Sequence, residues 1–498
     1  MKKFGIFLIT LTLLLTSSAC DRVNKPGEST TNVGETTTAH VHNAAKAVKE
    51  NEIQATCKAS GRYDSVIYCS SCGEEMARTK KNVPSVGHSY KNQKCIYCGA
   101  EESSEDETNN AQASKGLSFQ SNNNGTCALT GIGSCKDEDI IIPSKSPAGE
   151  TVTSIAASAF YARTSLFSVY IPDTVTVIGD DAFSACLNLQ TVRLPNNLES
   201  IGAGSFGSCD SLYYRRENGL GYIGSEENPY LILAEAVDQT KTTYQIHSST
   251  RFIQSCAFSS ATNLTSLVIP DSVVSIGICA FQNCGELVSV TLPKNLTVIE
   301  DSLFSSCRKL ETVNIPSGVT AIGISAFQFC NALKNVTLPE GLESIGQSAF
   351  YFCTSFTSVV IPKSVETVGM SAFKSCTSLT SVVFQNSLDV LEQSMFSDCS
   401  NLKNVTLPNG VETIEEYAFK NCIRLETFLI PSTVKTIEDH AFYMCRALQE
   451  VTFDQPNGWT CFELFSTNTD GEAVDLTDSV KNAKFLSDQY SNCTWKRS

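Results

Sequence analysis

The chain lacks the residue patterns of the common enzyme classes, and histidine is scarce. Only 5 of its 498 residues are histidine, and they are spread out. The sequence has no His-Glu-x-x-His motif, no Gly-x-Ser-x-Gly motif and no glycine-rich phosphate loop. Carboxylate pairs such as Glu415-Glu416 recur at the same position of a sequence repeat. A solvated edge explains these pairs better than acid–base catalysis does. We therefore expect that the protein is not an enzyme.

Positive charge and long apolar runs are also scarce. The chain has 37 Lys and Arg residues against 52 Asp and Glu residues, a formal net charge of −15. An acidic chain of this size repels nucleic acids and anionic membrane surfaces, and no basic patch reverses this. After Cys20 no stretch is long and apolar enough to span a bilayer. We expect no nucleic-acid partner, and membrane contact only through a lipid anchor.

The N-terminus has the pattern of a secretory signal at residues 1–19. Two lysines precede an apolar run from Phe4 to Leu15, and small residues follow it. The cysteine directly after them resembles a bacterial lipoprotein signal, in which Cys20 would be diacylated. The second acyl chain matters because one lipid chain anchors a protein weakly and two lipid chains anchor it stably. Ser17 and Ala19 leave ordinary signal peptidase and plain secretion as the alternative. In both cases we expect a secreted protein. With the lipid, it would be held at the bacterial cell envelope or surface.

A small cysteine-rich, zinc-ribbon-like module is predicted at 53–100, between a flexible stalk at 20–52 and an acidic linker at 101–118. Its two Cys-x-x-Cys pairs are Cys69, Cys72, Cys95 and Cys98. Four thiolates in paired knuckles suit tetrahedral zinc, and four thiolates leave no open position, so the zinc would be structural. The alternative is a minidomain stapled by disulfides, which an oxidising exterior favours. We expect no other cofactor.

Phenylalanine returns every 23 residues along most of the remaining chain. Twelve share one phase: Phe160, Phe183, Phe206, Phe258, Phe281, Phe304, Phe327, Phe350, Phe373, Phe396, Phe419 and Phe442. A unit of this length cannot bury its own apolar face, so it buries that face against copies of itself. The sequence therefore predicts stacked coils with the phenylalanines as the ladder of the core.

Each repeat has the same order of apolar and turn residues. One copy contains Leu310, Val313, Ile315, Pro316, Val319, Ile322, Phe327 and Cys330. The alternation Val-x-Ile predicts a strand with one buried face, and the proline, which has no amide donor, ends it. The Ala-Phe step is too short for a helix and predicts a single helical turn or tight corner. We expect a mainly β repeat solenoid over 151–453, with parallel strands about 4.8 Å apart.

This unit closely resembles the BspA-like leucine-rich-repeat surface proteins of bacteria, over roughly residues 119–498. The Thr126–Gly131 segment looks like the first coil of that family, and the segment around Trp459 looks like its terminal cap. The resemblance implies a leucine-rich-repeat horseshoe with caps at 119–150 and 454–498. It also implies adhesion at the cell surface, to matrix proteins, mucosal surfaces or other microbes.

The repeat is interrupted between Phe206 and Phe258, which are 52 residues apart. Tyr222–Ile223 and Tyr230–Leu233 flank a turn sequence and predict a hairpin insertion near 210–238. Insertions in solenoids often contact the ligand. The alternative is a hairpin that shields the core, and the sequence does not decide between them.

Ten cysteines stand three residues after a repeat phenylalanine: Cys186, Cys209, Cys284, Cys307, Cys330, Cys353, Cys376, Cys399, Cys422 and Cys445. Stacked side chains point the same way, which disfavours disulfide torsions, so we expect buried free thiols that act as small hydrophobes. Arg163 and Ala261 hold this place in two copies, which indicates that it does not demand sulfur. One pair in each cap is a candidate disulfide: Cys127 with Cys135, and Cys461 with Cys493.

The candidate binding residues stand between the two buried positions of each strand and point outward. They are Asn314, Thr337, Val360, Val383, Thr406 and Leu429. An exposed apolar stripe on a sheet marks a partner site, although β-branched residues also simply suit sheets. We expect an adhesin that recognises a host or microbial matrix protein, mucin or glycan. The alternatives are a structural envelope or spacer protein without a heterologous ligand, and glycan capture for uptake.

Overall fold

The computed structural model describes residues 48–53, 61–68, 75–83, 90–91, 94–95, 113–225, 227–408, 410–463 and 471–497. The chain divides into two compact units, Met1–Gly87 and His88–Ser498. Among the described residues, no helix is long and apolar enough to cross a membrane.

The first unit contains a three-stranded antiparallel sheet. Its strands are β1 (Val48–Ile53), β2 (Gly61–Tyr68) and β3 (Glu75–Val83), with β2 in the middle. Val48 pairs with Val66, so β1 lies partly inside the segment predicted as a flexible stalk. Pairing with β2 gives its backbone hydrogen-bond partners that a free stalk lacks. A separate antiparallel pair, in the second unit, joins β4 (Tyr90–Lys91) to β5 (Lys94–Cys95).

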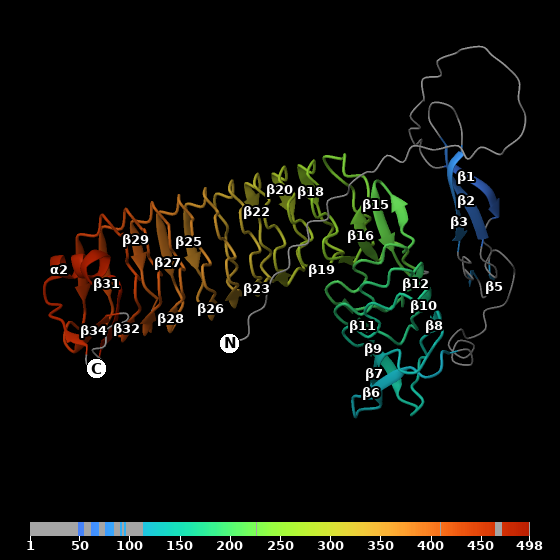
Figure 1. Ribbon diagram of the computed structural model, residues 1–498, viewed down its shortest axis with the longest axis horizontal. Coiled ribbons are helices and arrows are strands. Elements are labelled where there is room, and N and C mark those ends of the chain that lie inside the picture. The colour runs from blue at the N-terminus through green and yellow to red at the C-terminus, as the bar shows by residue number, and fades with distance from the viewer. Residues whose placement is uncertain are drawn as a thin grey trace, which may run out of the picture. The chain divides into compact units, whose positions relative to one another are not determined.

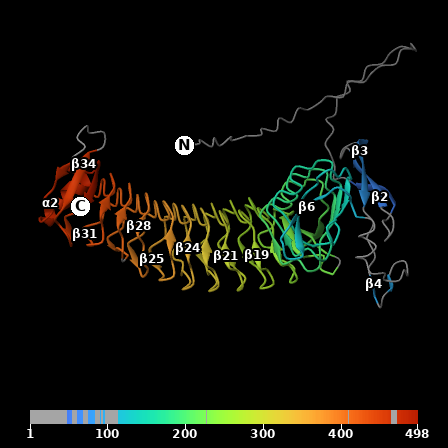
Figure 2. The same ribbon diagram turned by 90° about the horizontal axis from the view of Figure 1, so that it is seen from below.

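The second unit is the repeat solenoid, and its coils stack in chain order from β18 to β31 in both views (Figures 1 and 2). Most regular coils begin with the strand that the Val-x-Ile alternation predicts, although the coil that contains Val336 has no strand at this place. These first strands are β8 (Asp139–Ile141), β10 (Ser168–Tyr170), β12 (Thr191–Arg193), β18 (Ser266–Val268), β20 (Ser289–Thr291), β22 (Thr312–Val313), β25 (Ser358–Ile361), β27 (Ser381–Phe384), β29 (Asn404–Thr406), β31 (Thr427–Ile430) and β33 (Glu450–Phe453). Neighbouring first strands pair in parallel, as expected.

A second strand, shorter in most coils, follows and ends at the aliphatic residue five before the phenylalanine. These strands are β9 (Thr151–Ile155), β11 (Val177–Ile178), β13 (Ser200–Ile201), β17 (Phe252–Ile253), β19 (Ser275–Ile276), β21 (Val298–Ile299), β23 (Ala321–Ile322), β24 (Ser344–Ile345), β26 (Thr367–Val368), β28 (Val390–Leu391), β30 (Thr413–Ile414) and β32 (Thr436–Ile437). They form a second parallel ladder. Most have only two residues, too few to show an alternation in the sequence.

The Ala-Phe step is a turn, as predicted, and it carries a third ladder of backbone hydrogen bonds. In one coil the amides of Ser325, Phe327 and Phe329 donate to carbonyls of the next coil at 2.9, 2.8 and 2.9 Å. The residues two before and two after the phenylalanine have positive φ, for example Ser348 at 55° and Phe352 at 61°. Every other amide can therefore point along the stack, at the cost of two left-handed residues per coil.

The repeat phenylalanines form the predicted core ladder. Neighbouring rings stack with centroids 5.1–5.7 Å apart and interplanar angles of at most 17°. Each of these side chains is at most 2% exposed. The stack has two runs, Phe160–Phe206 and Phe258–Phe442, which lie in two core clusters.

The interruption between the runs holds the expected hairpin, with one strand more than predicted. Its strands are β14 (Arg215–Glu217), β15 (Leu220–Ile223) and β16 (Ile232–Ala236). β15 pairs antiparallel with both neighbours, and β16 pairs parallel with β17. The hairpin therefore starts the second-strand ladder of the second run (Figure 1).

Both ends of the solenoid are closed by antiparallel strands. At the start β6 (Ser118–Ser121) pairs antiparallel with β7 (Thr126–Gly131), and β7 continues in parallel into β9. The closing elements are β34 (Trp459–Glu463), β35 (Glu472–Ala473), helix α2 (Ser479–Lys484), π-helix η1 (Phe485–Gln489) and β36 (Cys493–Arg497). β36 pairs antiparallel with β32, and buried Asn482 donates from Nδ2 to the Val451 carbonyl at 3.0 Å. These contacts cover the last coil.

Candidate functional site

The predicted outward-facing residues hold one place in successive coils, in most of them on a first strand; Asn314 directly follows β22, and the coil of Thr337 has no first strand. We call this set the strand column: Val268, Thr291, Asn314, Thr337, Val360, Val383, Thr406, Leu429 and Thr452, all of which are exposed. In β25 the order Ser358, Val359, Val360, Ile361 alternates exposed and buried side chains. Val360 pairs with Val383, and Val383 pairs with Thr406. The structure thus brings these predicted residues side by side.

The C-terminal part of the strand column carries an apolar stripe. Val360, Val383 and Leu429 are 48%, 46% and 53% exposed. Polar residues flank the stripe on the same strands, among them Ser358 and Asn404. Three large apolar side chains in water within a few coils are unusual for a surface that has no partner. Val268, which is 66% exposed, is a separate apolar position nearer the N-terminus.

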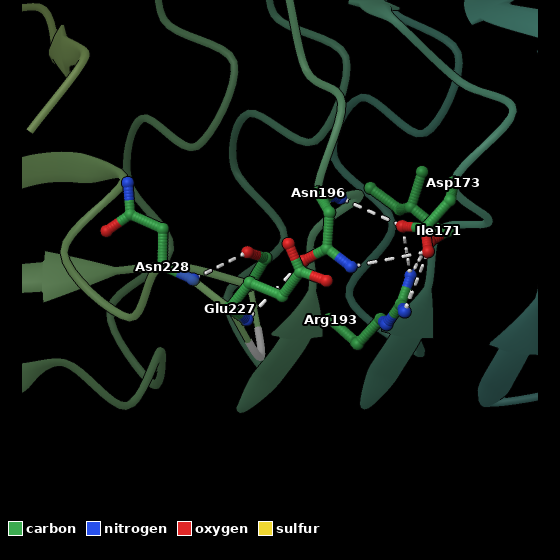
Figure 3. Close-up of polar contacts among 7 residues, drawn as sticks. Ile171, Asp173, Arg193, Asn196, Glu227 and Asn228 are labelled. Carbon is green, nitrogen blue, oxygen red and sulfur yellow. Dashed lines mark hydrogen bonds and ion pairs between the residues drawn. The ribbon is translucent and has the colours of Figure 1, made fainter. Parts of the chain in front are cut away.

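At the N-terminal end of the solenoid, Tyr170 and Arg193 hold the same place in their coils as the strand column. Both contact other residues of the protein. Arg193 forms an ion pair with Asp173 at 2.9 Å, and its guanidinium lies 4.7 Å from the Tyr170 ring centroid. Asn196 donates from its backbone amide to Asp173 at 2.8 Å and accepts from the Glu227 amide at 3.5 Å (Figure 3). This network ties the hairpin turn to the preceding coils and leaves less of this end accessible to a partner.

The hairpin insertion acts mainly as part of the core. All four residues of β15 are buried, and Leu220 and Tyr222 are at most 1% exposed. Tyr222 Oη accepts from the His247 amide at 3.2 Å, which links the hairpin to the irregular coil that follows. Of the two roles left open by the sequence, the buried faces support shielding of the core.

The cysteine column consists of buried free thiols, as expected, but it does more than fill space. Each of the ten thiols donates to the backbone carbonyl of the repeat phenylalanine one coil earlier, at 3.1–3.3 Å. Burial raises the pKa of Cys209 to about 12 and the pKa of Cys353 well above its usual range. The interpretation as small hydrophobes was therefore incomplete, because the sulfur also satisfies a backbone oxygen.

The two cysteines of the predicted disulfide in the N-terminal cap lie apart in the structure. Cys127 and Cys135 are both free. Cys127 lies at the start of β7, whereas Cys135 belongs to a turn closed by its amide donating to the Ile132 carbonyl at 3.0 Å. Five residues of extended strand span about 16 Å, so the turn holds Cys135 beyond the Cα separation that a disulfide allows.

In the C-terminal cap, Cys461 and Cys493 are also free thiols, but they are neighbours. They are diagonal on the paired strands β34 and β36, and their side chains hydrogen-bond to each other. The pKa values of both are raised, chiefly by burial. The structure therefore brings together the two residues of this pair without a bond between them.

Several predicted sites lie outside the described residues. These are Cys20, Cys69, Cys72, Cys98 and the side chain of Cys95. The lipid anchor and the zinc site therefore remain predictions.

Carboxylates also stack on the turn side of the last coils, at the place where the sequence predicts a solvated edge. Burial, together with nearby Glu392 and Glu438, raises the pKa of Glu415. Potential ligand atoms of Glu416, Asp439 and His440 lie within 4.8 Å of one another. Glu416 accepts from Gln393 at 2.9 Å, and Asp439 lies 3.0 Å from His440 Nδ1. Internal contacts thus already engage this group.

Comparison with known proteins gives the family. The model of the BspA type leucine rich repeat region matches residues 134–226, 251–380 and 366–494, in 6 copies. Solved structures that are similar include a leucine-rich repeat protein from Bacteroides ovatus, at 22% identity over 68% of this chain and 87% of that chain, with a TM-score of 0.36. Another is a leucine rich cell surface protein from Faecalibacterium prausnitzii, at 28% identity over 69% and 94%, with a TM-score of 0.32.

The pneumococcal vaccine antigen PcpA is also similar, at 18% identity over 70% of this chain and 82% of that chain, with a TM-score of 0.32. No curated protein matches the chain. The family model alone covers more than half of the chain and agrees with its stacked 23-residue coils. The chain therefore belongs to the BspA-type leucine-rich-repeat family.

Proposed function

We propose that the protein is a cell-surface binding protein that holds an extracellular protein or glycan on its strand column. The observation that carries this proposal is the apolar stripe. Val360, Val383 and Leu429 are about half exposed, whereas the alternate residues of the same strands are buried in the core. Their burial against a partner would remove apolar surface from water without disturbing the fold.

The dimensions suit a macromolecular partner better than a small molecule. Val360 and Leu429 are on strands three coils apart, a distance of about 14 Å at the usual strand spacing. Hydroxyl and amide side chains beside the stripe, such as Ser358 and Asn404, supply hydrogen bonds around an apolar centre. An apolar centre with a polar rim is the usual anatomy of a protein interface.

The predicted location of the protein at the cell surface supports the same function. Residues 1–19 have the pattern of a secretory signal, and a similar protein from Faecalibacterium prausnitzii is described as a leucine rich cell surface protein. Diacylation of Cys20 would hold the chain at the envelope and present the repeats outward. The absence of catalytic motifs in the sequence agrees with binding rather than catalysis.

The test is binding of the full chain to an array of matrix proteins, mucins and glycans. A Val360→Glu/Val383→Glu double variant should bind at least about tenfold more weakly, because central interface residues each contribute more than about 1 kcal/mol. Ile324→Glu/Val480→Glu is the matched control, since it places the same charges on exposed apolar residues outside the strand column. Thermal melting checks that both variants fold.

Loss of binding in the stripe variant alone would support the proposal. Equal binding by the stripe variant, the control and the parent chain would move the site away from the stripe. Self-association without any ligand would instead support the structural envelope alternative.

A further inference from the structure

Two cysteines outside the buried column lie at the surface of the solenoid. Among the cysteines whose side chains the structure describes, Cys256 is the exposed one and Cys279 the half-buried one, whereas all the others are buried. We call Cys256 and Cys279 the surface thiol pair. Both stand two residues before a repeat phenylalanine, and both thiols are free. A small ligand can therefore reach this pair from solvent, whereas the buried column is closed to it.

The two residues of the pair hold the same place in consecutive stacked coils. The Cys256 amide donates to the carbonyl of Ile278, the residue directly before Cys279, at 3.0 Å. The ring centroids of Phe258 and Phe281, two residues further along each coil, are 5.1 Å apart. One coil spacing therefore separates the two cysteines, and their side chains hydrogen-bond to each other. The stack thus places two accessible thiols side by side.

The turn itself does not require sulfur at this place. Serine holds it in six of the twelve coils, for example Ser302 and Ser325. Cys256 and Cys279 have φ of 60° and 57°, close to the 55° of Ser325. The column thiols each donate to a phenylalanine carbonyl, but serine serves as well as cysteine in this turn. The fold therefore leaves two successive thiols at the surface without a structural reason, which points to a ligand.

The stacking suits a shared metal ion better than a direct bond between the sulfurs. A disulfide requires sulfurs about 2.05 Å apart and a torsion of about 90°, which side chains that point the same way disfavour. A metal–thiolate bond is about 2.3 Å long, so two thiolates on opposite sides of one ion lie about 4.6 Å apart. This separation is close to the local coil spacing of 5.1 Å. A bridging ion thus requires the smaller displacement of the two coils.

Two thiolates alone select a soft ion that accepts two ligands. Thiolates favour soft ions such as Cu(I). Zinc also binds thiolates, but it takes four ligands, and within the described part of the chain the pair belongs to no group of three His, Cys, Asp or Glu ligands. Burial raises the pKa of Cys279, and Cys256 and the carboxylate of Asp301 raise it further. Protons therefore occupy the thiols until a metal displaces them, and the nearby carboxylate favours a cation.

We propose that the surface thiol pair binds one Cu(I) ion between Cys256 Sγ and Cys279 Sγ. Each thiol releases its proton to solvent as its Cu–S bond forms, and copper stays in the +1 state, so the step needs no oxidant. The pair lies on the turns, whereas the strand column lies on the first strands. The stripe variants should therefore leave copper binding unchanged.

The test is anaerobic titration of the full chain with Cu(I), in a phosphine reductant and in competition with a chromogenic Cu(I) chelator. The cysteine-rich module also offers thiols, so the informative quantity is the difference between the parent chain and its variants. Cys256→Ser/Cys279→Ser should bind one Cu(I) fewer, because a hydroxyl is a poor ligand for a soft ion. Cys353→Val removes a buried thiol instead and should bind as many ions as the parent chain. Thermal melting checks that both variants fold.

A second measurement uses only the parent chain. Cu(I) should protect Cys256 and Cys279 from alkylation by iodoacetamide, as read by peptide mass spectrometry. Titration with Zn(II) should give the same number of bound ions in the parent chain and in the double variant, because two thiols do not complete a zinc site.

Four results would overturn the proposal. The first is an equal number of Cu(I) ions in the parent chain and the double variant, and the second is alkylation of the pair that Cu(I) does not slow. The third is the loss of one Zn(II) in the double variant, since the pair would then not select a soft, two-coordinate ion. The last is a disulfide between Cys256 and Cys279 that persists in the reductant.

Discussion

The regular coils and the coils that open each run differ at the place three residues after the phenylalanine. In the regular coils a cysteine follows the phenylalanine by three residues and donates to the carbonyl of the preceding phenylalanine, as Cys353 does to Phe327 at 3.1 Å. The two opening coils have Arg163 and Ala261 at this place, and no repeat phenylalanine lies one coil before them. Sulfur is therefore present where the preceding coil offers that carbonyl and absent where it does not.

The two exceptions therefore have a structural reason. From sequence they indicate only that the place does not demand sulfur. The structure shows that it demands a small buried donor in a stacked coil and has no such demand at the start of a run. The missing cysteine at 261 is thus a marker of the break.

The largest expected effect is the loss of a ring from the middle of a stack. Phe350 stacks on Phe327 at 5.2 Å and on Phe373 at 5.4 Å, whereas the repeat ring beside Phe206 is Phe183, at 5.2 Å. Phe350→Ala should cost about 3–5 kcal/mol of unfolding free energy, and Phe206→Ala less, because one neighbouring coil is missing there. Urea unfolding of both variants measures the difference. Equal losses would mean that the break does not interrupt the core.

Alkaline pH should weaken the regular coils through their thiols. The pKa of Cys209 is about 12 in the folded chain against 9.0 ordinarily. Below pH 9 both states hold the proton, so this stabilisation is complete. Between pH 9 and 12 the unfolded state releases it first, and stability falls.

The measurement is the urea midpoint from pH 7 to 11, in the parent chain and in Cys209→Val. The variant should lose less stability over this interval. Parallel curves for the two proteins would show that the Cys209 thiol does not contribute to the fall.

The left-handed turn residues should tolerate no β-branched side chain. Ser348 has φ of 55°, and Ser348→Val should cost about 1–2 kcal/mol or more, since a branched Cβ is poorly compatible with this conformation. Ser348→Gly should be neutral or stabilising. Differential scanning calorimetry of the two variants tests this, and equal melting temperatures would contradict it.

The smallest expected effect tests the thiol comparison directly. Cys353→Val removes the donor to the Phe327 carbonyl at nearly constant volume and should cost about 1 kcal/mol. Ala261→Cys adds a thiol where no repeat-phenylalanine carbonyl is stacked, and it should give no gain. Chemical unfolding of the two variants measures both changes. A stabilising Ala261→Cys would refute the explanation of the break.

Much of the fold followed from local pattern. The phenylalanine period predicted the stack, the Val-x-Ile alternation predicted the outward column with Val360 and Val383, and the two strand-like segments about Gly224 predicted the hairpin. Each of these needs only the side chains of one coil and the rule that a coil packs on its copy. The second strands escaped notice because a strand such as Val298–Ile299 is too short to alternate.

By itself, the sequence determined the solenoid, its buried ladder and the face that points to solvent, because these depend on periodicity along the chain. Tertiary structure decided what each group meets across coils. It separated Cys127 from Cys135, placed Cys461 beside Cys493, and gave every thiol of the column a carbonyl. Such contacts join residues a whole coil or more apart, and their geometry is set by how two coils stack.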